Sequence, residues 1–195
     1  MRIALGFRPH TTWTVAVAVG DPGTSVVERR RIELGDPSLP DQVYHAAREL
    51  DIEAAADLVR RAEGAVAATA AHGLGEFVAD LRAGGHEVTA AGLPTAGAHL
   101  PESLGKILAS HALLHAAEGD LVRGALIEAA SGQGLTVYRA AARDLVAHAC
   151  AALGYDERTL GRMLDDLGRA IGPPWRRDEK DATLAAWLAL KSADR

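Results

Sequence analysis

The sequence predicts one α/β domain built on a five-stranded mixed sheet with helices on both faces. Three short strand-like segments joined by turns open the chain, and two later strand-like segments are separated by helical stretches. Strands joined by tight turns pair antiparallel, whereas helical crossovers normally return parallel and right-handed. We therefore expect residues 1–195 to form a single domain with three antiparallel strands and two parallel additions.

Composition places the chain among globular proteins with a substantial core. It has 195 residues, 48% of them hydrophobic and 24% charged, and a net charge of −5. The single cysteine, Cys150, excludes a disulfide framework and a cysteine-based zinc site. Neither a signal-peptide pattern nor a membrane-spanning run follows Met1, so we expect a cytoplasmic protein without a membrane partner. The acidic balance argues against tight, nonspecific nucleic-acid binding.

The first half of the chain is punctuated by turns. Pro9-His10-Thr11-Thr12 and Gly20-Asp21-Pro22-Gly23 separate the opening strands, and a helical region follows. We expect a break in that region near Leu50-Asp51-Ile52, and Gly64, Gly73 and Gly75 weaken the case for one continuous second helix. The predicted strands cover residues 2–7, 13–19 and 25–34, and the helical region covers 41–82.

The second half alternates strands and helices, with a loop through Pro94 and Pro101. Gly119 or Gly124 is a candidate interruption of the long helix, Ser103 a candidate N-cap for it, and Asp156 a candidate N-cap for a later one. The predicted strands cover residues 86–93 and 135–139, and the helices cover 103–130, 142–153, 157–171 and 179–192.

Two aspartates mark the start of the last helix. Asp178 and Asp181 share one stripe with Ala185 and Leu188, on the face that should pack on the core. The helix dipole favours anions at this end, and simple capping by Asp178 would explain half of the pattern. Burying unpaired carboxylates is costly, so a partner, a metal or a reaction is the competing explanation.

The element order and this motif together resemble the ribonuclease H-like superfamily. Actin-like sugar kinases share the same fold. The sequence Asp178-Glu179-Lys180-Asp181-Ala182 is similar to the last helix of RuvC-type Holliday-junction resolvases. The resemblance implies that Asp178 and Asp181 help to bind two Mg²⁺ or Mn²⁺ ions, which activate water and stabilise the leaving oxygen of a phosphodiester. It also implies a nucleic-acid partner.

Two departures from the RuvC pattern put this chemistry in doubt. The first strand of the family ends in an essential aspartate, but here Gly6-Phe7-Arg8-Pro9-His10 places Arg8 at that position. The fourth strand ends in a glutamate, whereas residues 88–92 hold no carboxylate. An arginine supplies the charge of a cation, so Arg8 is expected to bind phosphate without a metal. The sequence therefore predicts a degenerate active site.

A second group of ionisable residues lies on the long helix. His111, His115 and Glu118 project from one face, which predicts that they point inward or into a cleft, opposite Arg123. Three alternatives remain open: a structural hydrogen-bond network, a Zn²⁺ site as the less favoured metal, or a general base beside Asp181. We therefore take these three residues together with the two aspartates as the candidate catalytic set, and Asp178, Asp181 and Glu118 as the candidate metal ligands.

The remaining candidates have simpler explanations. On a strand, Arg29 and Arg31 share one face and Arg30 takes the other, as in a solvated sheet. Trp175 is expected to anchor a loop on the core, and His45 to be solvated at a helix start.

Three functional classes remain. The first is a degenerate or atypical nuclease-like protein acting on nucleic acid, the second a non-catalytic binding or scaffold module of the same fold, and the third a small-molecule or metal-dependent enzyme using the His/Glu pocket. A basic surface around Arg29, Arg31, Arg176 and Arg177 would favour the first. The alanine-rich region 41–82 could equally pair with another subunit or pack internally, so an oligomer stays open.

Overall fold

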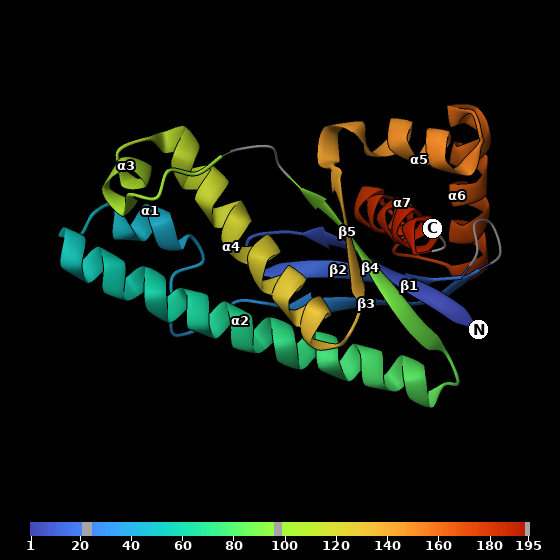
Figure 1. Ribbon diagram of the computed structural model, residues 1–195, viewed down its shortest axis with the longest axis horizontal. Coiled ribbons are helices and arrows are strands. Elements are labelled where there is room, and N and C mark those ends of the chain that lie inside the picture. Colours follow the sequence, from blue (N-terminus) through green and yellow to red (C-terminus); the bar gives the residue numbers. More distant parts are fainter. Residues whose placement is uncertain (21–24, 96–98, 194–195) are drawn as a thin grey trace.

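The computed structural model describes residues 1–20, 25–95 and 99–193. It contains a five-stranded sheet in the order β3-β2-β1-β4-β5 (Figure 1). The pairs β1/β2 and β2/β3 are antiparallel, and β1/β4 and β4/β5 are parallel, which confirms the predicted meander with two parallel additions. The strands are β1 (Arg2–Pro9), β2 (Trp13–Val19), β3 (Val26–Glu33), β4 (Glu87–Thr95) and β5 (Thr136–Ala141). Residues 21–23 of the predicted turn and 96–98 of the predicted loop lie outside the described residues.

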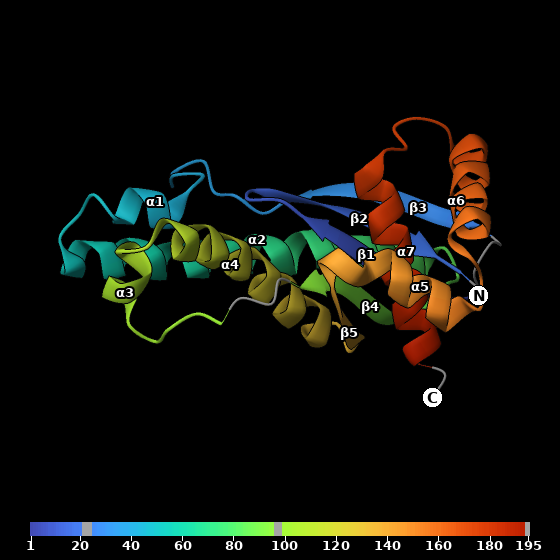
Figure 2. The same ribbon diagram turned by 90° about the horizontal axis from the view of Figure 1, so that it is seen from above.

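The helices cover both faces of the sheet. In Figures 1 and 2, α2 and α4 lie on one side, and α5, α6 and α7 on the other. The helices are α1 (Val43–Ala47), α2 (Ile52–Ala83), α3 (Leu104–Leu108), α4 (His111–Gly132), η1 (Ala142–Asp144), α5 (Leu145–Leu153), α6 (Glu157–Ile171) and α7 (Arg177–Ser192). Among the described helices, none is long and apolar enough to cross a membrane.

Alternation along β1 divides the core into two layers. Ile3, Leu5 and Phe7 pack with α2 and α4, whereas Ala4 packs with α7 on the opposite face. A third apolar cluster joins α1 and α3 to the ends of α2 and α4 that project beyond the sheet (Figure 2). His111, His115 and Glu118 of the predicted site lie at that end, where α4 meets α1.

The predicted break before the second helix is confirmed. The Asp51 side chain accepts hydrogen bonds from the backbone N–H groups of Glu53 and Ala54, and α2 begins at the next residue, Ile52. The helix then runs continuously to Ala83. Its glycines do not interrupt it because ten buried apolar residues along one face hold it on the core.

The predicted long helix from residue 103 is in fact two helices. The break lies at Ala109 and Ser110, between α3 and α4, and neither Gly119 nor Gly124 interrupts α4. Ser103 occupies the N-cap position of α3 without a side-chain capping hydrogen bond. The Asp156 cap is confirmed, since its side chain accepts a 2.7 Å hydrogen bond from the Thr159 N–H.

Candidate functional site

The position of α7 depends on two glycines in the sheet. A Cβ atom on Gly6 of β1 would overlap the carbonyl oxygen of Ala182, and one on Gly92 of β4 would overlap that of Ala185. Gly6 and Gly92 face each other in the parallel pair β1/β4. The α7 backbone therefore lies directly on the two central strands, which brings the first turn of α7 to the end of β1.

Asp178 does not cap α7, so the capping explanation is wrong. Arg176 is the N-cap residue, and its backbone N–H donates a 2.7 Å hydrogen bond to Glu179 Oε2. The buried Glu179 thus supplies the N3 acceptor of a capping box at the start of α7. Asp178 is left to face the residues at the end of β1.

Arg8 lies between the two aspartates. Its Nε is 3.7 Å from Asp178 Oδ1 and 3.5 Å from Asp181 Oδ2. This Nε is shielded from solvent and makes no hydrogen bond, so the interaction is a loose, charge-dominated ion pair. Arg177, which is 87% exposed, adds a second cation 3.6 Å from Asp181 Oδ2.

A stack of rings supports Asp178 from the β2 side. His10 Nε2 lies 2.9 Å from Asp178 Oδ2, and the His10 ring stacks on Trp13 with centroids 3.8 Å apart. The Arg31 guanidinium lies 4.0 Å from the centroid of the Trp13 ring on which it packs. Because Arg8 and His10, which contact its carboxylate, lie at and just after the end of β1, Asp178 is held at the C-terminal end of this central strand.

Burial raises the pKa of the Asp181 carboxyl above its ordinary value. Desolvation is the largest cause, Asp178 adds to it, and the neighbouring Arg8 and Arg177 oppose it. The folded protein thus resists a charge at Asp181 even with two cations beside it.

The residues at this position do not fit the pair of divalent cations that the RuvC resemblance implies. A magnesium ion takes oxygen ligands, whereas the guanidinium of Arg8 is a cation placed against both carboxylates. In β4, the residues beyond Gly92 are Leu93, Pro94 and Thr95, which include no carboxylate. Among the described residues at this position, the carboxylates are therefore those of Asp178 and Asp181.

A pocket of about 180 Å³ opens beside this ion-pair cluster. Its lining comes from the turn after β1, from the residue before α1 and from one face of α4. The lining residues are Pro9, His10, Thr11, Gln42, His115, Glu118, Gly119, Val122 and Arg123. His10 belongs both to this lining and to the Asp178 contacts, so it connects the aspartates to the pocket.

Arg123 lines the pocket, against the prediction that it lies opposite Glu118. A Cβ atom on Gly119 would lie 2.8 Å from Arg123 Nη1, so the glycine makes room for the guanidinium against the preceding helical turn. Burial lowers the pKa of Arg123, Asp120 raises it, and Arg8 lowers it further. Within the described part of the chain, Arg123 makes no ion pair within 4 Å.

Glu118 points inward as predicted and holds α1 in place. Its Oε1 accepts hydrogen bonds from the backbone N–H groups of Tyr44 at 2.7 Å and His45 at 3.2 Å, and it lies 3.3 Å from His45 Nδ1. Glu118 is only 7% exposed. Its carboxylate therefore serves as the N-terminal cap that the α1 residues themselves do not provide.

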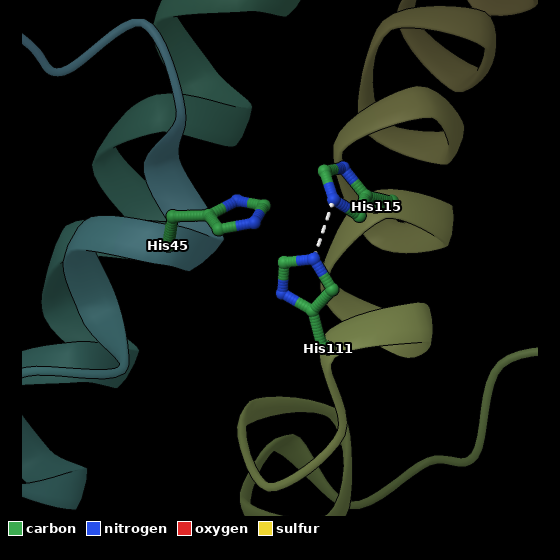
Figure 3. A group of neighbouring side chains, drawn as sticks. All are labelled: His45, His111 and His115. Carbon is green, nitrogen blue, oxygen red and sulfur yellow. Dashed lines mark hydrogen bonds between the residues drawn. The ribbon is translucent and has the colours of Figure 1, made fainter.

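His115 lines the pocket, in line with the predicted cleft, whereas His111 is not among the residues that line it. His111 and His115 are exposed, because the break at Ser110 starts α4 beyond the edge of the sheet. Their Nε2 atoms are 3.1 Å apart, and His45 of α1 points between them (Figure 3). His45 is half-buried, so the expectation that it is solvated is wrong. Its role depends on the contact of α1 with α4, which no local pattern reveals.

The predicted site residues thus form two groups. Asp178, Asp181 and Arg8 lie at the junction of β1 and α7, whereas His111, His115 and Glu118 lie where α4 meets α1. The structure shows no contact between the two groups among the described residues, and the pocket lies between them.

The other candidates have structural roles. Trp175 Nε1 donates a 2.8 Å hydrogen bond to the Leu164 carbonyl, as expected of an anchor. Arg29 donates to the carbonyls of Gly172 and Pro173 before α7, while Arg30 on the opposite face pairs with Glu28 and Asp80. Since the Arg29 fork is occupied by backbone carbonyls, it is not a free member of a basic surface.

Comparison with solved structures finds similarity to RuvC over nearly the whole chain. The Thermus thermophilus RuvC structure is 16% identical with a TM-score of 0.54, and covers 98% of this chain and 95% of that chain. T. thermophilus RuvC in complex with Holliday junction substrate is 14% identical with a TM-score of 0.55, and covers 100% and 96%. No protein-family model and no curated protein gives a match. The fold is therefore ribonuclease H-like in the RuvC arrangement, as predicted.

Proposed function

We propose that this chain is a RuvC-like nucleic-acid-binding protein that does not hydrolyse phosphodiesters with metal ions at the RuvC site. The observation that carries the proposal is the pairing of Arg8 with both Asp178 and Asp181. A guanidinium in this place neutralises the carboxylates, but it cannot lower the pKa of a water as a metal ion does.

The fold supports nucleic acid as the partner. The RuvC structure to which this chain is similar was solved with a Holliday junction substrate, and the likeness spans the whole chain. Branched DNA is therefore the first ligand to test, ahead of duplex and single-stranded DNA.

The charges around the pocket support binding of backbone phosphate. Arg123 lines the pocket without an ion-pair partner among the described residues, and Arg177 is largely exposed at the start of α7. Arginine binds phosphate oxygens in a bidentate manner, and a half-buried arginine has already lost part of its hydration. We expect Arg123 to contact phosphate directly, and Arg8 to hold the aspartates neutralised beneath it.

The test is a fluorescence-anisotropy titration of labelled four-way junction, duplex and single-stranded DNA between about 50 and 200 mM salt. We expect the junction to bind most tightly, with or without EDTA. Arg123→Ala should weaken binding and reduce the slope of log K against log salt by about 1. Arg60→Ala is the matched control, because it removes one charge from the exposed surface of α2.

Two results would overturn the proposal. Absence of binding to all three nucleic acids at the lowest salt would leave a scaffold role for the fold. Magnesium-dependent cleavage of the junction, lost in Asp181→Asn, would show that the RuvC site is catalytic despite Arg8.

A further inference from the structure

A second site lies outside the ion-pair cluster, where α1 meets the first turn of α4. His45, His111 and His115 each offer a ring nitrogen, and these three atoms lie within 4.8 Å of one another (Figure 3). We propose that these three histidines bind one Zn²⁺ ion. The site does not depend on the proposed nucleic-acid binding.

The geometry of α4 favours a shared ion. His111 and His115 are one helical turn apart, so their rings emerge from one face. Their Nε2 atoms are 3.1 Å apart. Two nitrogens bound tetrahedrally to one zinc ion at about 2.05 Å are separated by about 3.3 Å. The observed spacing is therefore close to that of a bound pair.

The orientation of His45 favours the third ligand position. Its Nδ1 lies 3.3 Å from Glu118 Oε1, which leaves Nε2 as the ligand atom directed at the other two histidines. A metal-binding histidine commonly donates its other ring N–H to a carboxylate, which fixes the tautomer and the ring orientation. Glu118 is buried and is itself held by two backbone N–H groups, so it is a rigid partner for this purpose.

The surrounding charges bear on whether a cation can replace the hydrogen bond between the His111 and His115 rings. His111 is the first residue of α4, where the helix dipole disfavours a cation. The Glu118 carboxylate, in contact with His45, opposes this effect with a full negative charge. Neutral imidazole ligands suit Zn²⁺, whereas magnesium takes oxygen ligands.

The fourth coordination position would remain open. His111 and His115 are exposed, and His115 also lines the pocket that holds Arg123. Three protein ligands with one open position is the arrangement of catalytic zinc sites, whereas structural sites are closed by four protein ligands. An ion here would also connect α1 to α4, two elements otherwise joined by Glu118 and apolar contacts.

The experiment uses untagged, metal-stripped full-length protein titrated with Zn²⁺ by calorimetry and with Co²⁺ by visible absorption. We expect one ion per chain, a tetrahedral Co²⁺ spectrum, and a rise in melting temperature with Zn²⁺. His111→Ala and His115→Ala, which alter exposed side chains, should each reduce the affinity at least about 10-fold, as should Glu118→Gln through its contact with His45. His72→Ala is the control, since His72 is an exposed α2 histidine paired only with Glu76 among the described residues.

Lack of stoichiometric binding by the wild-type chain would overturn the proposal. Equal affinity of wild type and His111→Ala, or an equal loss in His72→Ala, would overturn it as well. His45→Ala could loosen α1, so its zinc affinity is used only if its circular dichroism matches that of wild type. If the two spectra differ, the result for His111→Ala decides.

Discussion

Arg8 Nε and Asp181 Oδ2 lie 3.5 Å apart at the junction of β1 and α7, where the RuvC resemblance predicts a carboxylate opposite a carboxylate. Arg8 places a cation beside both Asp178 and Asp181. Its electrostatic consequences can be measured without knowing any ligand.

Replacing Arg8 by methionine should destabilise the protein at neutral pH. The variant keeps an apolar side chain of similar length but leaves Asp178 and Asp181 facing each other without Arg8. Because the pair is partly exposed, we expect a loss of about 1–2 kcal/mol in the free energy of unfolding, between the values for surface and buried pairs. Urea unfolding at pH 7 measures it. Arg60→Met, at the exposed pair with Asp57, should change stability by less than about 0.5 kcal/mol; an equal loss there would refute the special role of Arg8.

The raised pKa of Asp181 predicts a definite pH dependence. Between the ordinary carboxyl pKa of about 3.9 and the higher folded value, the folded state binds more protons than the unfolded state. The contribution of this group to stability therefore falls as the pH rises through that window. Asp181→Asn removes the effect, so relative to wild type it should gain stability on going from pH 3 to pH 7, by less than about 1 kcal/mol after screening. Unfolding curves at both pH values test the sign, and a relative loss at pH 7 would contradict it.

Gly6 and Gly92 should be the least replaceable positions in the sheet. Gly6→Ala and Gly92→Ala each drive a methyl group into the α7 backbone, which is a rigid neighbour. We expect each to cost at least about 3 kcal/mol, or to prevent folding, because α7 must move off the two central strands. Gly64→Ala, inside α2 with no heavy atom within 4 Å of the added Cβ, should instead stabilise by about 0.5–1 kcal/mol. Thermal unfolding of the three variants compares them directly.

The topology was predictable because it follows from local signals. Tight turns require antiparallel neighbours and helical crossovers require parallel ones, and the five strands follow that rule. The family motif placed Arg8 near the aspartates, but the partner expected from the sequence was phosphate, whereas in the structure Arg8 pairs with Asp178 and Asp181. His45 and Arg123 were not predictable, because their roles depend on the packing of α1 on α4 and on space beside Gly119. Periodicity placed Glu118 inside but could not show that its partners are the backbone N–H groups of α1.

Glu118→Ala should loosen α1 specifically. The variant leaves the Tyr44 and His45 N–H groups without their acceptor, and hydrogen bonds to a charged group contribute about 1.5–3 kcal/mol each when made. We expect a loss of about 3 kcal/mol, the lower end for two such bonds, and faster hydrogen exchange at these two amides than elsewhere in α1 and α2. Glu118→Gln keeps an acceptor oxygen, so its stability should lie between those of wild type and Glu118→Ala. Glu128→Ala, on the exposed face of α4, should change neither the stability nor the exchange rates. Equal changes in Glu128→Ala would contradict the role of Glu118 as the cap of α1.

Arg8→Asp is the sharpest test of what Arg8 replaces. The variant collects three carboxylates at the junction of β1 and α7, where their repulsion should lower the melting temperature in the absence of divalent ions. Oxygen ligands in this arrangement suit Mg²⁺, so millimolar Mg²⁺ should restore the melting temperature of the variant by mass action while leaving wild type unchanged. Arg8→Asn is the control, because it is isosteric with aspartate but adds no charge. If Mg²⁺ stabilised both variants equally, Arg8 would not occupy a cation position. We expect no cleavage of a four-way junction even by Arg8→Asp, since β4 ends in Leu93, Pro94 and Thr95 and supplies no further carboxylate.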